Sequence, residues 1–400
     1  KFLKKAGFTD PENFKIFVIH IRRPLFHILR CRQATATVCV CVYERERYIY
    51  ISRGVSRFFQ RGIAEVPPGE AGLDLFRPYF PVGPSVETLP QLPNDAPFGL
   101  VVPDEDFAQL IRRKLCTGAS GGPSGWRGEY LEPLIEDEDC FTSLAQLTTD
   151  ILNGVLDYRA RAYIVGDRGI AIPKSDGTIR PICCPEIFDK LAAMYNIKRI
   201  KMDVPAIFHP INLAVGEKGG PETAIHMLRF FLEEIPGFCG AEMDIKNAFN
   251  EGNRSSILTE LNEERRLAPL LRHTHWKYGN HSDIWVQASN GTLCGAIRSS
   301  QGTKQGDAYS SHLFPLLIQP DIKEALTAAR RNERACEAIA IQDNVWFVGT
   351  PQAVCVAVRC FTRRIRERNL VTNPAKEKWV WFHDGPIPNE LIRLRPRRNI

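Results

Sequence analysis

Two short apolar runs that each carry an aspartate near one end limit what this chain can fold into. The first is a strand-like run at 238–245 that contains Asp244. The second, at 338–349, has two apolar halves around Gln342–Asp343–Asn344, which is typical of a tight hairpin. If these strands are neighbours in one sheet, both carboxylates meet at one edge. Paired carboxylates of this kind can hold Mg²⁺ ions for in-line phosphoryl displacement, although either aspartate alone is more often a turn or cap residue.

The composition is that of an ordinary globular protein. Hydrophobic residues make up 44% and charged residues 24% of the 400 residues, which excludes disorder or a coiled coil for most of the chain. The uncharged runs fall short of the roughly 18 apolar residues that a membrane span requires, so we expect no membrane partner. The twelve cysteines form no C-x-x-C pair, which favours reduced, mostly buried thiols in an intracellular protein.

The charge is distributed unevenly along the chain. The net charge is +6 overall, but residues 1–65 carry +8 and residues 359–400 carry +7, which leaves the middle acidic at −9. Two basic ends around an acidic centre favour a polyanionic partner, with carboxylates concentrated where a metal could bind. Solvated surface charge is an equally good explanation for the charge pattern alone.

Periodicity and turn signals predict a mixed succession of helices and strands. A Pro/Gly-rich stretch, Val66–Pro97, is expected to be an extended linker or irregular arm. A hairpin is expected at 161–182 with its turn at Ser175–Asp176–Gly177, and a further strand near 378–382. Apolar spacing predicts helices at 104–114, within 127–160, and at 185–202, 220–234, 254–268, 306–334 and 351–368.

The order of these segments resembles reverse transcriptases of the non-LTR retroelement type, over roughly Phe80–Trp381. The segments that carry the resemblance are GGPSGWRGEYLEPL (121–134), PKSDGTIRPICCPEIFDKLAA (173–193), LAVGEKGGPETAIHMLR (213–229), DIKNAFN (244–250), SSQGTKQGDAYSSHLF (299–314), IQDNVWFVG (341–349) and NLVTNPAKEKW (369–379). They look like the segment before the fingers, the fingers hairpin and helix, a Gly-rich loop, palm motifs A, B and C, and the segment of the palm lysine. Each match is weak alone, and the order makes them strong together.

The resemblance implies an α/β fold with α+β character, shaped as a right hand. An antiparallel palm sheet would be flanked by helices, with fingers present, and a thumb largely absent because 19 residues follow Trp381. The implied divisions are a basic N-terminal extension at 1–65, a Pro-rich linker or arm at 66–103, fingers at 104–235, a palm at 236–383 and a basic tail at 384–400.

The resemblance also assigns site residues. The catalytic set would be Asp244, Asp343, Asn344 and Lys376, with Asp244 and Asp343 as ligands of two Mg²⁺ ions, for which Mn²⁺ can substitute. Nucleotide-binding residues would be Lys174, Arg180, Phe249, Gln305 and Gly306, with the Phe249 ring excluding a 2′-hydroxyl and Arg180 gripping the triphosphate.

Each assignment has a plainer alternative. Phe249 could be a buried aromatic residue in a turn, and Lys174 and Arg180 could be solvated hairpin charges. Gly306 could begin a helix capped by Asp307. Lys378 competes with Lys376 for the role of the palm lysine.

The expected function is RNA-directed DNA synthesis by a retroelement protein, with an RNA template, a DNA or RNA primer and deoxynucleoside triphosphates as partners. Asn344 departs from the family, which has a second aspartate there, and an uncharged amide would hold the second ion less firmly. The alternative is a weakened or inactive relative that binds RNA within a ribonucleoprotein. An RNA-directed RNA polymerase is disfavoured by Phe249. The compartment would be the nucleus or cytoplasm for the enzyme, or an organelle for the alternative.

Overall fold

The computed structural model describes residues 27–33, 36–42, 62–115, 118–216, 218–331, 335–383 and 386–394, the first two ranges as backbone alone. The chain divides into two compact units. One unit consists of residues 1–64 together with 171–180, and the other of residues 65–170 together with 181–400. The extension expected at 1–65 and the tail expected at 384–400 fall mostly outside the described residues.

The first unit contains one hairpin and the tip of a second. The strands concerned are β1 (His27–Gln33), β2 (Ala36–Val42), β3 (Asp167–Pro173) and β4 (Ile179–Pro185). At the tip between β3 and β4, the Asp176 carboxylate accepts hydrogen bonds from the Thr178 amide (3.0 Å) and hydroxyl (2.6 Å). Gly177 adopts a φ of 81°, which glycine adopts without steric cost. The turn predicted at Ser175–Gly177 is therefore confirmed.

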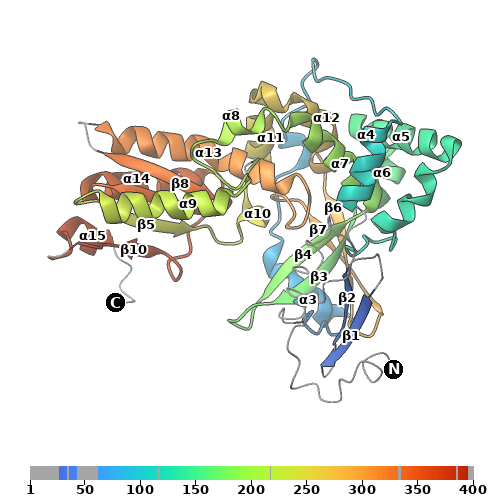
Figure 1. The fold of residues 1–400 in the computed structure, drawn as a ribbon, viewed down its shortest axis with the longest axis horizontal. Coiled ribbons are helices and arrows are strands. Elements are labelled where there is room, and N and C mark those ends of the chain that lie inside the picture. The colour runs from blue at the N-terminus through green and yellow to red at the C-terminus, as the bar shows by residue number, and fades with distance from the viewer. Residues whose placement is uncertain are drawn as a thin grey trace. The chain divides into compact units, whose positions relative to one another are not determined.

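A four-stranded sheet forms the centre of the second unit's C-terminal half (Figure 1). Its strands lie in the order β10 (Lys378–Val380), β5 (Cys239–Asp244), β9 (Asn344–Gly349) and β8 (Cys336–Ile341). All three neighbouring pairs are antiparallel. The predicted antiparallel sheet thus exists, and the hairpin predicted around Gln342–Asp343–Asn344 is its β8–β9 pair.

Alternation along the strands gives this sheet two faces. Ala241 and Phe347 are register partners, and both are fully buried in the main core together with residues of α13 (Ser310–Ala329) and α14 (Pro351–Glu367). Burial of a side chain such as Phe347 contributes roughly 1.5–3 kcal/mol. On the other face, Trp346 packs with residues of α9 (Gly220–Arg229). Helices therefore cover both faces of the sheet, and one end of β5 stays accessible.

A second sheet has the order β4-β3-β6-β7, where β6 (Ser282–Gln287) and β7 (Leu293–Ser299) form an antiparallel hairpin. β3 pairs in parallel with β6 through Asp167–Gly169. The β6–β7 hairpin was not predicted. Its turn contains Asn290–Gly291, a dipeptide that commonly marks a hairpin turn, so a signal for it was present in the sequence.

The remaining helices divide between the main core and a second core, which is formed by buried residues between 101 and 152 and between 187 and 192. Aspartates cap three of them, because Asp104, Asp137 and Asp157 accept hydrogen bonds from the amides of Phe107, Cys140 and Arg159, each at 2.8 Å. The α-helices are α4 (Glu105–Leu110), α5 (Glu138–Asn153), α6 (Tyr158–Ile164), α7 (Ile187–Ile200), α8 (Val204–Phe208), α10 (Ala248–Glu251), α11 (Arg254–Glu263), α12 (Leu271–Tyr278) and α15 (Asn389–Leu394). Short 3₁₀ or π turns lie at Arg77–Tyr79, Val86–Thr88, Ile111–Leu115, Gly128–Leu131, Pro133–Ile135, Phe230–Glu234 and Arg265–Leu270.

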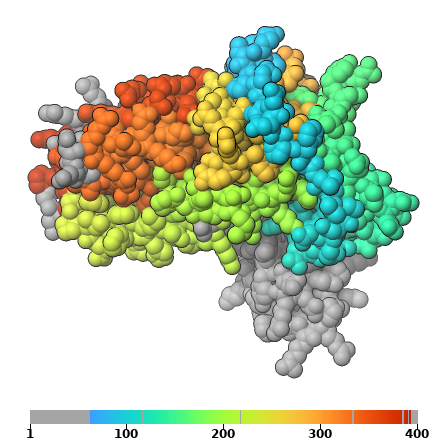
Figure 2. Space-filling view, turned by 90° about the horizontal axis from the view of Figure 1, so that it is seen from above, coloured from blue at the N-terminus to red at the C-terminus, as the bar shows by residue number. Residues whose placement is uncertain are grey.

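The stretch expected to be an extended linker, Val66–Pro97, is partly helical and packs on the protein. It contains α3 (Glu70–Phe76), whose Phe76 side chain is fully buried. Further along, the segment runs over the surface of the second unit, where it is coloured blue in Figure 2. The Arg272 guanidinium of α12 donates to the Ala96 carbonyl of this segment at 3.1 Å. Prolines remove amide donors without preventing apolar burial, and this is why composition alone suggested an extended linker or irregular arm.

Most predicted helices are confirmed with shifted ends. The helix expected at 306–334 begins later, at Ser310, and the stretch 254–268 divides into α11 and a 3₁₀ turn. The stretch 127–160 holds α5 and the start of α6 after two 3₁₀ turns. Within the described part of the chain, no helix is both long enough and apolar enough to cross a membrane.

Candidate active site

The structure brings Asp244 and Asp343 to one end of the central sheet. Asp244 is the last residue of β5, and its register partner on β9 is Asn344. The amide of Ile245 donates to the Asp343 carbonyl at 3.4 Å. The Asp244 side chain is 14% exposed. The two predicted metal ligands and the asparagine beside them therefore share one partly accessible edge.

Two other segments of the chain form hydrogen bonds with the turn that carries Asp343. Gln342 adopts a φ of 55°, and its side-chain amide donates to the Ser311 carbonyl at 3.4 Å. Asn212 donates to the Gln342 carbonyl at 3.5 Å, and the chain at Asn212 bridges to Ala340 of β8. These contacts from two separate segments fix the direction in which the turn presents Asp343.

The sequence left open which of Lys376 and Lys378 lies at the candidate site, and the structure gives the two lysines different partners. The Lys376 ammonium lies 3.3 and 3.4 Å from the two carboxylate oxygens of Asp244. Lys378 instead pairs with Glu242 at 2.7 Å, across the β10–β5 register. A hydrogen bond from the Asn373 amide to the Asp244 carbonyl, at 2.7 Å, attaches the lysine-bearing segment to β5. Lys376 is therefore the lysine at the candidate site.

The oxygen atoms at this edge suit a hard divalent cation. Asp244 and Asp343 supply carboxylates and Asn344 supplies an amide oxygen, and Mg²⁺ is commonly held by one or two carboxylates with waters and substrate phosphates. Among the described residues, no group of three or more His, Cys, Asp or Glu side chains is arranged to hold a metal ion. A cation at this edge would need further ligands, such as water or substrate phosphate oxygens.

Phe249 lies beside the loop at 299–306, which connects β7 to α13 and which we call the 299–306 loop. The Thr303 amide donates to the Phe249 carbonyl at 2.7 Å. The Phe249 ring is half-buried, with its centroid 5.2 Å from that of Phe314. Gly302 is obligatory here, because a Cβ on it would lie 2.2 Å from the Phe249 carbonyl oxygen. The predicted nucleotide-binding segments thus contact each other directly.

Gln305 and Gly306 face the β4 strand. The Cys183 amide donates to the Gln305 carbonyl at 2.7 Å. A Cβ on Gly306, whose φ is 115°, would lie 2.2 Å from the Cys183 carbonyl oxygen. The alternative in which Gly306 begins a helix capped by Asp307 is wrong, because α13 begins at Ser310.

Asp307 belongs instead to a buried ionic cluster. Its carboxylate accepts from Lys277 at 2.6 Å and from the Tyr278 hydroxyl, and Lys277 also donates to Asp189 of α7. His273 contacts Asp189 at 3.0 Å. Burial alone would raise the pKa of Asp189, but Lys277 and His273 outweigh it and hold that pKa below its usual range. Sequence spacing gave no signal for this cluster, which joins α7 and α12 to Asp307, the residue directly after the 299–306 loop.

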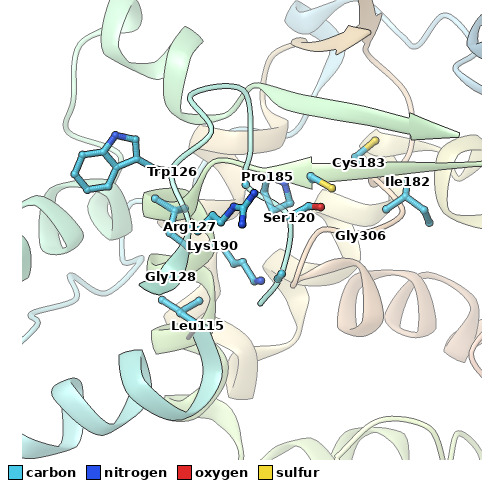
Figure 3. A pocket seen from close by; sticks show the side chains of 14 residues that line it. Leu115, Ser120, Trp126, Arg127, Gly128, Ile182, Cys183, Pro185, Lys190 and Gly306 are labelled. Atoms are coloured by element: carbon cyan, nitrogen blue, oxygen red, sulfur yellow. The ribbon is translucent and has the colours of Figure 1, made fainter. Parts of the chain in front are cut away.

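A cavity of about 130 Å³ opens between the GGPSGWR segment and Gly306 (Figure 3). Arg127 and Lys190 line it, together with Cys183 and Cys184. Trp126 is 39% exposed, and its ring centroid is 5.6 Å from that of Phe188. The cavity combines cationic and aromatic side chains, which suits a nucleotide or a phosphate.

Lys174 and Arg180 lie in the other compact unit. The Lys174 amide donates to the Thr178 carbonyl at 2.8 Å, and the Arg180 side chain is exposed. The described contacts do not join these two residues to Asp244. Their roles in nucleotide binding remain predictions.

Comparison with known proteins finds sequence similarity to a protein of a retrotransposable element. No family model matches the sequence. The chain is 27% identical over 271 residues to the retrotransposable element SLACS 132 kDa protein of Trypanosoma brucei gambiense. The match covers 67% of this chain and 22% of that protein, so the chain spans about a fifth of the relative's length. The protein is therefore related in sequence to a retrotransposable element protein.

Proposed function

We propose that this protein is an RNA-directed DNA polymerase of a retroelement, with the β10-β5-β9-β8 sheet as its palm. The observation that carries the proposal is the meeting of Asp244, Asp343 and Lys376 at the end of that sheet. The order of the sequence motifs and the retrotransposable element relative support the same function.

In this proposal, each part of the site has one task. Asp244 and Asp343 would hold two Mg²⁺ ions, which supply charge stabilisation for phosphoryl transfer from a deoxynucleoside triphosphate to a primer 3′-hydroxyl. The Phe249 ring would exclude a 2′-hydroxyl. Lys376 would release Asp244 when metal binds and donate a proton to the departing pyrophosphate. Arg180 and Lys174 would bind phosphate oxygens, and Gln305–Gly306 the nucleotide and its template base.

Primer extension tests the proposal. The chain is incubated with an RNA template, a primer and deoxynucleotides in Mg²⁺ and then in Mn²⁺, beside an Asp244→Asn variant. We expect extension that falls by at least about 1,000-fold in the variant, because a metal ligand loses its charge. Glu242→Gln is the matched control, since Glu242 lies on the same face of β5 and pairs with Lys378, and it should stay active.

Asn344 favours a second candidate function, that of a non-catalytic RNA-binding component of a ribonucleoprotein. An amide at this position weakens metal binding without altering a surface that grips phosphates. Absence of extension in both metals, together with tight RNA binding that weakens steeply with salt, would replace the polymerase proposal with this one.

A further inference from the structure

Arg254 is a buried cation whose hydrogen bonds concentrate on the 299–306 loop. It is the first residue of α11, it follows the Asp244 motif by four residues, and its side chain is 2% exposed. Its Nε donates to the Gly302 carbonyl at 3.1 Å, and its Nη2 donates to the Gln301 carbonyl at 3.1 Å. Further bonds reach the Ser299 carbonyl at 3.4 Å and the Ser299 hydroxyl at 3.3 Å.

Neutral oxygen atoms surround the buried Arg254 guanidinium. All of the loop partners are neutral oxygen atoms, and one further bond reaches the Asn280 carbonyl at 3.3 Å. A buried charge is expensive unless it is paired or fully hydrogen-bonded, and burial lowers the pKa of Arg254 to about 10. The guanidinium carries several donors in a rigid fork, which no other side chain supplies. The loop therefore depends on arginine, and on its planar geometry, at this position.

The loop that Arg254 holds is clamped from its other side by α10. The Thr303 amide and hydroxyl both contact the Phe249 carbonyl, at 2.7 and 3.3 Å. The Gln301 side-chain amide donates to the Glu251 carbonyl at 3.3 Å. Arg254 thus fixes one side of the 299–306 loop. The opposite side of the loop contacts the segment of Phe249, which is proposed to face the nucleotide. A shift of this loop changes the distance between Phe249 and Gln305–Gly306.

We propose that Arg254 is a positioning residue that sets the spacing between Phe249 and the 299–306 loop, and thereby the selection of deoxynucleotides over ribonucleotides. This inference rests on the proposed function and names a determinant of its substrate choice. Lysine at this position keeps the positive charge but lacks the planar guanidinium group. The 299–306 loop therefore loses several hydrogen bonds, while a buried cation remains.

Arg161 provides a matched control. It is half-buried, and its guanidinium donates to the carbonyls of Trp276 (2.6 Å), Lys277 (3.0 Å), Asn280 (3.3 Å) and His281 (3.1 Å), of which only the Asn280 carbonyl is shared with Arg254. These carbonyls belong to the end of α12 and the turn after it, outside the 299–306 loop. Arg161→Lys should therefore impose a comparable loss of buried hydrogen bonds without moving the loop.

The first measurement is amide hydrogen exchange by mass spectrometry on the wild-type chain, Arg254→Lys and Arg161→Lys. We expect peptides covering 299–306 to exchange about tenfold faster in Arg254→Lys and at the wild-type rate in Arg161→Lys. Unchanged exchange in Arg254→Lys, or equal acceleration in both variants, would overturn the inference. This result does not depend on catalysis, so it decides the positioning role even if the polymerase proposal fails.

The second measurement is the ratio of kcat/KM for a deoxynucleotide to that for the matching ribonucleotide. We expect Arg254→Lys to lower this ratio about tenfold and Arg161→Lys to leave it unchanged. A lower rate with an unchanged ratio in Arg254→Lys would mean a merely structural role. If Arg254→Lys does not fold, Ser299→Ala removes one hydroxyl partner, and a rise in loop exchange of about threefold is expected. No rise would contradict the inference.

Discussion

Asp244 shares its end of the sheet with the amide of Asn344 and the ammonium of Lys376, as the sequence predicts. Its register partner is Asn344, and the Lys376 ammonium contacts both of its carboxylate oxygens. Lys376 is 61% exposed, so its flexible side chain can leave without opening the core. The Lys376 ammonium offsets the charge of the Asp244 carboxylate, and the Asn344 amide adds no negative charge beside it.

Asn344→Asp tests this account of the site. A second carboxylate opposite Asp244 strengthens metal binding, so we expect the Mg²⁺ concentration for half-maximal primer extension to fall and the rate to rise about tenfold. Asn344→Ala is the control, and it should lower the rate because the amide oxygen is lost. The readout is a metal titration of extension rate for the three proteins. An unchanged rate in Asn344→Asp would show that this position does not contribute to metal binding.

At the scale of elements, regular local patterns were predictable and contacts between distant segments were not. The alternating strands β5 and β9 and the tight turn at Gln342–Asp343 follow from hydrophobic period and turn chemistry, and these placed the two aspartates correctly. The buried partners of Lys277 and Lys304 were not predictable. Lys304 donates to the Asp167 carboxylate, 137 residues away, and charged residues at such spacing look like solvated surface in a sequence.

The Lys277 cluster gives a prediction at this scale. Lys277→Met leaves the carboxylates of Asp189 and Asp307 buried without their shared cation, which should cost about 3–5 kcal/mol of unfolding free energy. Urea unfolding at pH 7 measures the loss. Lys198→Met is the control, because Lys198 pairs with Asp106 at 2.9 Å on an exposed surface, and such pairs contribute little. Equal effects in the two variants would show that the cluster does not stabilise the fold.

For the whole molecule, two histidines that are shielded from solvent, His275 and His312, make stability depend on pH. Burial lowers the pKa of His275 to about 4 and that of His312 to about 4, from an ordinary value of 6.5. Each ring is neutral in the folded protein at neutral pH, and His275 contacts the Asn262 side-chain oxygen at 2.7 Å. The pKa of Asp189 is also lowered from its usual value of 3.8, so its contribution to stability is lost only as the pH falls below that value.

The direction of the effect follows from proton linkage. An unfolded histidine binds a proton near pH 6.5, whereas these two bind one near pH 4 when folded, so falling pH favours the unfolded chain between these values. We expect the urea midpoint to be highest above pH 6.5 and to decline steadily towards pH 4. His275→Gln, which keeps a hydrogen-bond donor but cannot titrate, should decline less steeply over the same interval. Parallel curves for the two proteins would mean that protonation of His275 does not drive the loss, because the remaining titrating groups are common to both.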